Sequence, residues 1–283
     1  MTDRPRPPLP EPLPHPVVDN HCHLDIRRGS QTRPPTPEQV RQALAEAATV
    51  NISRVVQVGC DLPGARWAVE AARRHPELVA AVALHPNEVP GLAASGLLAE
   101  AWAEIERLAE DPVVRAIGET GLDYFRTSEP HWRVQQESFA WHIDLAKRLN
   151  RTLVIHDRDS HQDVLKVLDA EGTPERWVMH CFSGDRDFAR ACLDRGAYLS
   201  FAGTVTFANA HDLREALASA PRDRVLVETD APFLTPHPYR GASNASYLIP
   251  VTVRLMAQVR QEDLGDLCAA IDGNTSRAFG GAW

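Results

Sequence analysis

The sequence has no long apolar run, no secretory leader pattern and no excess of basic residues. No stretch of about 18 uninterrupted apolar residues occurs, so we expect no membrane-spanning helix. Residues 2–16 are rich in proline and lack the apolar segment of a signal peptide, which predicts a cytoplasmic protein. A net charge of -8 argues against a broad basic surface for duplex nucleic acid. A nucleic-acid substrate held locally at a metal site remains compatible with that charge.

Cysteine is scarce and irregularly spaced. Five cysteines, an odd number, fit reduced thiols better than a disulfide framework. Cys22 and Cys181 stand beside histidines, and strand alternation predicts that both face the helices as buried packing residues. Cys60, Cys192 and Cys268 show no partner in the sequence.

Short apolar runs alternate with helical patterns along the whole chain. The runs begin at residue 17 and continue at 54–60, 79–84, 113–117, 152–155, 177–179, 198–202 and 225–227. Nearly continuous apolar character is typical of strands buried on both faces. Eight such units predict an α/β fold, a (β/α)8 TIM barrel forming a single hydrolase domain over residues 17–283. Residues 1–16 are expected to form a solvated, disordered tail. A doubly wound sheet is the main alternative, but no glycine-rich phosphate turn follows the first run.

Helices are expected between these runs. Their predicted ranges are 37–50, 63–75, 97–110, 131–149, 160–170, 185–195 and 209–218, with a helical end from about residue 248. A polar loop is expected over 27–37. Thr36 and Pro37 suit the N-cap and first position of the first helix, and Asn274 and Thr275 are predicted to cap a last short helix.

Metal-ligating side chains follow the apolar runs at the points where the runs end. His21 and His23 are two residues apart and therefore share one face of the first run. The other runs concerned end in Glu119, His156, His180 and Asp230. Each of these residues alone could be an ordinary core, loop or capping residue. The carboxyl ends of barrel strands meet at one mouth, however, so the six together predict a metal site there.

Two ions suit this set of ligands better than one. Six protein ligands on one ion would leave no open position for water, whereas two ions about 3.5–4 Å apart could share them. Glu119 is then the natural bridge, and the positive excess would attract a phosphate diester. The imidazoles favour Zn²⁺, Mn²⁺ or Co²⁺ and phosphate chemistry favours Mg²⁺, so the identity of the two divalent metal ions stays open.

These motifs resemble the TatD family of metal-dependent deoxyribonucleases, within the amidohydrolase-like superfamily. The resemblance covers residues 17–280 and rests on Asp19–Asp25, Gly118–Tyr124, Ile155–Arg158, His180–Gly184 and Glu228–Leu234. It implies that His21, His23 and Asp230 hold one ion. It implies that His156 and His180 hold the other, with Glu119 between the two ions.

Other residues are candidates for substrate contact. His85 and Arg158 follow the third and fifth runs and could hold a phosphate; a turn role for His85 and pairing of Arg158 with Asp157 or Asp159 are the alternatives. Tyr124, with the next residue Phe125, could stack a terminal base or simply pack within a loop.

The loop after the eighth run also resembles the family pattern. Arg240 and Asn244 look like the family's substrate-side loop, although Ala245 and Ser246 stand where Glu-Pro is common.

The resemblance implies a 3′-to-5′ exodeoxyribonuclease on single strands, with DNA as the partner. We expect a monomer, although the sequence contains no signal for the oligomeric state. Glu119 and Asp230 are the catalytic candidates, and Asp230 is placed to act as general base. An amidohydrolase-type enzyme that cleaves C–N or ester bonds, including a D-aminoacyl-tRNA deacylase, is the first alternative. A metal-binding barrel without hydrolytic activity is the second.

Overall fold

The eight predicted strands form one parallel sheet in a computed structural model that describes residues 5–26, 34–281 and 283. The strands are β1 (Val17–Cys22), β2 (Ile52–Gly59), β3 (Leu78–Val82), β4 (Val114–Asp123), β5 (Thr152–Arg158), β6 (Trp177–Met179), β7 (Tyr198–Phe201) and β8 (Val225–Val227). Each strand pairs with the next in sequence. Cys22 in β1 bridges to Ala231, just after β8, and this contact closes the ring. The predicted (β/α)8 barrel is confirmed.

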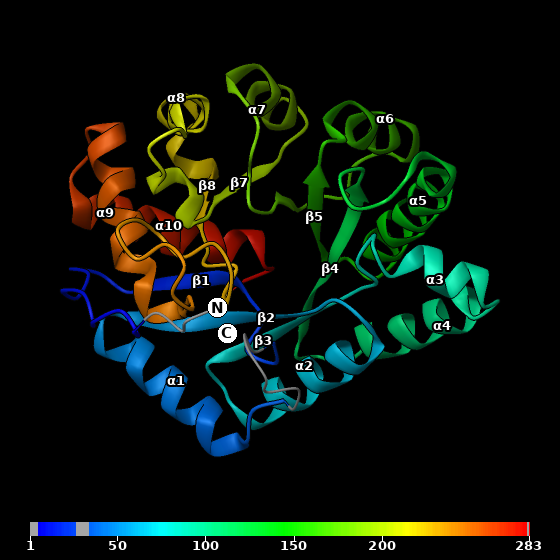
Figure 1. Cartoon of the computed structure of the whole chain (residues 1–283), viewed down its shortest axis with the longest axis horizontal. Coiled ribbons are helices and arrows are strands. Elements are labelled where there is room, and N and C mark those ends of the chain that lie inside the picture. Colours follow the sequence, from blue (N-terminus) through cyan, green and yellow to red (C-terminus); the bar gives the residue numbers. More distant parts are fainter. Residues whose placement is uncertain (1–4, 27–33, 282) are drawn as a thin grey trace.

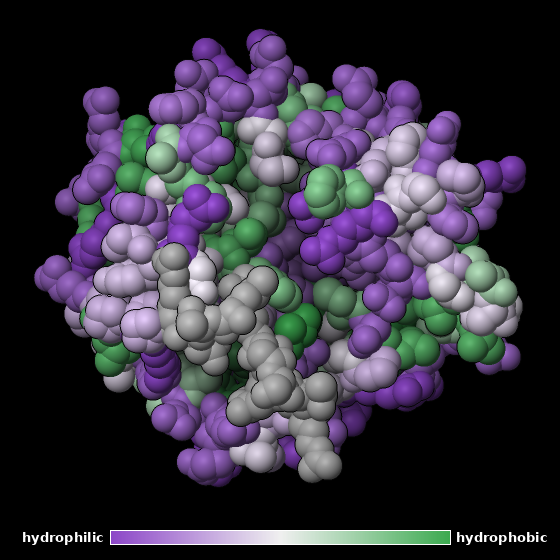
Figure 2. All heavy atoms as spheres, in the orientation of Figure 1, coloured by the Kyte–Doolittle hydropathy of each residue, from purple (hydrophilic) through white to green (hydrophobic). Residues whose placement is uncertain are grey.

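Helices surround the strands as an outer ring (Figure 1). They are α1 (Pro37–Thr49), α2 (Leu62–Arg74), α3 (Val89–Ala94), α4 (Leu98–Ala109), α5 (Trp132–Arg148), α6 (His161–Glu171), α7 (Arg186–Leu193), α8 (His211–Ser219), α9 (Ile249–Arg260) and α10 (Leu264–Ala278). Hydrophilic side chains predominate on the rim that these helices form (Figure 2). None of the helices in the described part of the chain is long and apolar enough to cross a membrane.

The sequence located most of these elements. Thr36 caps α1 as predicted, in a capping box with Gln39. The short α3 was not predicted. Residues 27–33 of the predicted 27–37 loop lie outside the described residues.

The prediction that Asn274 and Thr275 cap a last helix is wrong, because both lie inside α10. The Asn274 amide donates to the carbonyls of Arg222 and Val225, and the Thr275 hydroxyl donates to the Ile271 carbonyl. The Asn274 side chain thus bonds outside its own helix, whereas the Thr275 hydroxyl bonds back to a carbonyl of α10 itself. Asp263 is the residue that caps α10.

A second apolar cluster, separate from the large core under the helices, fills the inside of the barrel. It contains inward residues of the strands, such as Val56, Val154 and Leu226, together with Ala278 and Phe279 at the end of α10. Side chains alternate along β5, so His156 shares the face of Val154. His156 therefore points into the mouth at the carboxyl end of the strands.

The segment before β1 differs from the predicted solvated tail. Residues 5–16 form no helix or strand, yet Leu13 is buried. The Tyr247 hydroxyl donates to the Pro7 carbonyl at 2.8 Å, and the Asn51 amide donates to the Leu13 carbonyl at 2.5 Å. Proline has no backbone N–H, so this segment mainly needs donors for its carbonyls. The Tyr247 and Asn51 side chains supply such donors and hold the segment against the barrel.

Candidate metal centre

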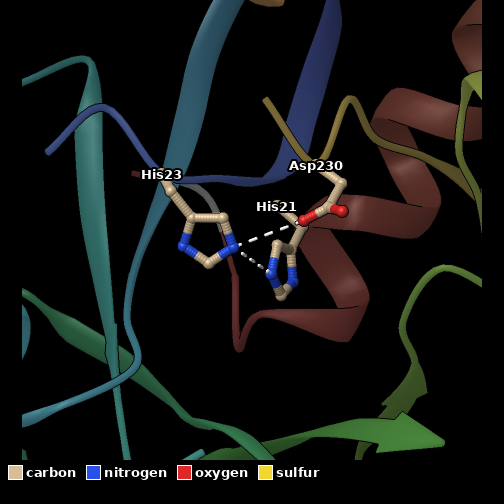
Figure 3. Close-up of side chains that lie close together, drawn as sticks. All are labelled: His21, His23 and Asp230. Carbon is tan, nitrogen blue, oxygen red and sulfur yellow. Dashed lines mark hydrogen bonds and ion pairs between the residues drawn. The ribbon is translucent and has the colours of Figure 1, made fainter. Parts of the chain in front are cut away.

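The structure brings all six predicted ligands together at the carboxyl end of the strands. His21 lies in β1 and His23 just after it, and Asp230 follows β8. These three side chains point toward one another (Figure 3). The His23 Nε2 atom is 3.3 Å from both the His21 Nε2 atom and an oxygen of Asp230. Ring nitrogens and a carboxylate oxygen at this spacing form a donor set for a divalent cation.

Glu119 occupies the middle of the cluster. The β4–β5 register shifts between Ile117 and Thr120, and this irregularity contains Glu119. Glu119 Oε1 lies 2.6 Å from His156 Nδ1 and 3.2 Å from His180 Nε2. Its Oε2 lies 3.4 Å from His21 Nε2. The two oxygens of one buried carboxylate thus face two different groups of imidazoles, which is the arrangement of a bridging ligand.

Three of the histidines face an oxygen on their outer side: hydrogen bonds orient His23 and His156, and an ion-pair contact orients His180. His23 Nδ1 is 2.9 Å from the Val58 carbonyl, His156 Nε2 is 3.3 Å from Asp123, and His180 Nδ1 is 2.8 Å from Glu228. Carbonyl and carboxylate oxygens accept, so each of these outer nitrogens carries the N–H.

The inner nitrogens of these rings consequently present lone pairs to Glu119 and Asp230. Two acceptors at 2.6–3.3 Å repel unless a proton or a cation lies between them. Outer partners that fix the tautomer are also what metal-ligating histidines commonly have. The residues present therefore fit a divalent metal ion on the inner side.

The pKa values of the metal-free site show how strongly it attracts positive charge. Burial lowers the pKa of His156, but hydrogen bonds to Asp123 and Glu119 outweigh burial and raise it to about 9. Burial likewise opposes protonation of His180, while the charges of Glu228 and Glu119 raise its pKa well above the usual value. Raised pKa values favour protons at these positions, and a bound ion would take their place.

Sequence reasoning missed three carboxylates that support the ligands. Besides Asp123, these are Glu228 and Asp19, both fully buried. Glu228 accepts from the Ser200 hydroxyl at 2.5 Å and from the Cys181 backbone N–H at 3.0 Å, in addition to its contact with His180. All three residues lie inside the motifs that carry the family resemblance. The motifs alone do not show which carboxylate faces the mouth and which faces a histidine.

Asp19 links β1 to the loop after β8. It accepts from the hydroxyls of Thr229 at 2.6 Å and Ser246 at 2.7 Å. Burial raises the pKa of Asp19 to about 6, although these hydrogen bonds oppose the rise. Ser246, which departs from the family's usual Pro, thus ties the loop to the strand that carries His21.

The cysteines require two corrections. All five are free thiols, as predicted, and Cys22 is buried in the core. Cys181 is only half-buried: β6 ends at Met179, and a φ of 42° at Cys181 shows that strand alternation no longer applies. Cys60 has partners after all, since its Sγ lies 3.5 Å from Glu119 Oε2 and 3.7 Å from His23 Nδ1.

Of the predicted substrate contacts, His85 lies closest to the ligands. Its Nε2 is 3.6 Å from Glu119 Oε1, and its ring packs edge-on against His156. Arg158 lies two residues beyond His156 in β5 and stacks over the ring of Phe125 at 4.0 Å. Phe125 is 62% exposed.

The other three predicted substrate contacts are engaged elsewhere. Tyr124 stacks on Trp132, and its hydroxyl donates to Asp163 at 3.0 Å, which is the packing alternative left open by the sequence. The Asn244 amide donates to two backbone carbonyls, at Thr229 and Phe233, and so holds the loop after β8. Arg240 is exposed and lies over the ring of Phe207, at 4.0 Å from its centroid.

Comparisons with known proteins find relatives that are described as metal-dependent hydrolases. The family model described as TatD related DNase matches residues 18–280. The uncharacterized metal-dependent hydrolase TatD of Mycobacterium tuberculosis is 44% identical over 94% of this chain and 99% of its own length. YabD of Bacillus subtilis, also an uncharacterized metal-dependent hydrolase, is 36% identical over 93% of this chain and 98% of its own. The TatD homologue YjjV of Escherichia coli superposes with a TM-score of 0.83, covering 93% of this chain and 97% of that chain; at 24% identity it supports the fold alone.

Proposed function

Because this chain belongs to the TatD-related DNase family of metal-dependent hydrolases, we propose that it cleaves phosphodiester bonds of DNA at the 3′ end of single strands. The observation that carries the proposal is the position of Glu119. Its two oxygens face separate groups of imidazoles, at 2.6–3.4 Å. A bridging carboxylate of this kind is typical of two-metal hydrolytic sites.

Each ligand has a proposed place. His21, His23 and Asp230 would hold one ion, and His156 and His180 would hold the other, with Glu119 shared between them. Divalent ions, when bound, supply Lewis-acid chemistry that activates water and neutralises charge on phosphate oxygens. Zn²⁺, Mn²⁺ and Mg²⁺ are the candidates, because the donors combine imidazoles with carboxylates.

Asp230 is the proposed general base. Its side chain is 15% exposed, so it meets the mouth, whereas Glu119 is 5% exposed. Interaction with His23, strengthened by the charges of neighbouring histidines, outweighs burial and keeps the pKa of Asp230 below its ordinary value. A carboxylate that stays ionised at neutral pH can accept a proton from the attacking water.

Residues on the rim of the mouth would hold the substrate. His85 and Arg158 would contact the phosphate next to the scissile bond. Phe125, exposed beside Arg158, would stack on the terminal base. Every base has a face that can stack, so this contact would not depend on the sequence of the strand. A mouth ringed by strands and helices accepts a strand end more readily than a continuous duplex.

Labelled oligonucleotides test this function. Protein loaded with Mn²⁺ is expected to shorten a 5′-labelled single strand stepwise and to leave a closed single-stranded circle intact. Asp230→Asn should shorten the strand far more slowly, while Asp187→Asn, a matched change at an exposed position on α7, should behave as wild type. Cutting of the circle at a similar rate would refute the exonuclease. Hydrolysis of a D-aminoacyl-tRNA ester without any cleavage of DNA would establish the amidohydrolase-type alternative instead.

A further inference from the structure

The opposite end of the barrel holds a cavity lined by five arginines. Arg115 is the second residue of β4, and Arg151, Arg176 and Arg224 directly precede β5, β6 and β8. Arg277 joins them from the last turn of α10. The cavity, which we call the basic cavity, has a volume of about 670 Å³. Because parallel strands all begin at one end of the barrel, it lies at the far end from the metal centre.

Positive charge in the basic cavity is poorly balanced within the protein. Glu175 is the one carboxylate among the described lining residues, and Asp223, outside the lining, lies 3.7 Å from Arg224 with its side chain 65% exposed. The Glu175 side chain is 75% exposed and 3.4 Å from Arg176, and exposed pairs of this kind interact weakly. Burial, with the charges of Arg115 and Arg176, lowers the pKa of Arg151. The guanidinium of Arg151 is therefore repelled by those of Arg115 and Arg176.

Two buried N–H groups of the basic cavity also lack an acceptor among the described residues. The Nε atoms of Arg151 and Arg176 are buried and have no hydrogen-bond partner among the described residues. Their terminal nitrogens donate to backbone carbonyls, at Asp111 for Arg151 and at Asn150 for Arg176. Neutral carbonyls satisfy these N–H groups without cancelling the charge, and a buried donor without an acceptor is costly. An occupant that brings acceptor oxygens and negative charge would satisfy both needs.

We propose that the basic cavity binds a compact polyphosphate-type anion with two or three linked phosphate groups. The planar guanidinium fork matches phosphate oxygens in a bidentate way. The arginines are spread over several strand starts, and neighbouring strands lie about 4.7–4.9 Å apart, so a single phosphate would reach only some of them. A cavity of this size falls within the range of small-ligand sites.

The aromatic residues of the basic cavity favour a phosphate chain over a nucleobase. The guanidinium of Arg224 lies over the Tyr198 ring, 5.1 Å from its centroid. Phe279 is fully buried in the cluster inside the barrel. Neither ring offers a free face for stacking, whereas the arginines offer donors. This site is independent of the proposed nuclease function.

Calorimetric titration with tripolyphosphate at constant ionic strength tests the proposal. The metal-loaded protein is expected to bind tripolyphosphate, and Arg151→Gln and Arg176→Gln should each weaken binding at least tenfold. Arg107→Gln, at a position 64% exposed on α4, is the matched control and should bind as wild type. Tripolyphosphate also binds metal ions, so Glu119→Gln is measured in parallel and should retain the arginine-dependent binding.

The outcomes separate the alternatives. Arg176→Lys keeps the charge but loses the fork, so weaker binding by this variant with an unchanged melting temperature supports the site without a folding defect. The affinity for ATP is measured beside that for tripolyphosphate. If ATP binds through these arginines as tightly as tripolyphosphate or more weakly, the ligand is a free phosphate chain. If ATP binds more tightly, the ligand is a nucleoside phosphate. The proposal is overturned if tripolyphosphate does not bind, if binding depends on Glu119 alone, or if a single-stranded oligonucleotide binds through these arginines while tripolyphosphate does not.

Discussion

Replacing Glu228 by glutamine changes one charge next to the metal centre without removing a ligand. Glu228 is fully buried and lies 2.8 Å from His180 Nδ1. The amide oxygen of glutamine can still accept from His180 and from the Cys181 N–H. Its amide nitrogen, however, must then face the Ser200 hydroxyl, which already accepts from Asn20. The ring of His180 therefore keeps its tautomer but loses the charge that makes its inner nitrogen a strong donor.

The size of the effect follows from the lost charge. A hydrogen bond to a charged group contributes about 1.5–3 kcal/mol, and its neutral counterpart about half as much. Loss of an outer partner of a ligating histidine typically weakens metal affinity or activity about 10–100-fold, or about 1.4–2.8 kcal/mol. We therefore expect Glu228→Gln to weaken binding of one Mn²⁺ ion by roughly 30-fold, within that range, and to leave the other ion little affected.

The assay is calorimetric titration of metal-free protein with Mn²⁺. Glu129→Gln, a matched change at an exposed position, is the control and should titrate as wild type. The reasoning is refuted if Glu228→Gln binds both ions with affinities within twofold of the wild-type values, because Glu228 would then have no electrostatic role toward His180.

Three further predictions follow from single residues. Asp230→Asn should keep metal at saturating concentration yet lose about 10²–10⁴-fold in kcat with little change in KM, measured on an oligonucleotide; full activity on adding metal would make Asp230 only a ligand. Burial lowers the pKa of His142 from 6.5 to about 4, while its Nε2 accepts from the Leu84 N–H. As the pH falls from 6.5 toward 4, only the unfolded chain binds the proton at this position, so the free energy of unfolding should fall by up to about 3 kcal/mol. In urea unfolding, the free energy of unfolding of His142→Gln should depend less steeply on pH than that of the wild type, and an equal dependence would contradict this. Phe125→Ala should raise KM about fivefold or more, since stacking a base contributes about 1–3 kcal/mol; an unchanged KM would leave Phe125 without a substrate role.

The fold could be predicted because each strand has its own apolar run in the sequence. Runs such as 54–60 and 177–179 are apolar on both faces, and only a covered parallel sheet explains eight of them. The convergence of the six candidate ligands could be predicted for a related reason. Each follows such a run, and the barrel brings all strand ends to one mouth.

The remaining features depend on which separate segments meet. Glu228 faces His180 and not the mouth. Cys60, directly after β2, lies 3.5 Å from Glu119 in β4. Neither contact has a local pattern, because it is set by the approach of two different strands. The segment around Leu13 was misjudged in the same way: its composition is that of a tail, but donors on distant elements hold it.

The central claim is that Glu119 bridges two ions, and metal stoichiometry tests it most directly. Metal-free protein titrated with Mn²⁺ and then analysed for metal should contain two ions per chain at saturation. The double variant His156→Ala/His180→Ala should contain one, held by His21, His23 and Asp230. Saturation of the wild type at a single ion, unchanged in the double variant, would contradict the two-metal site.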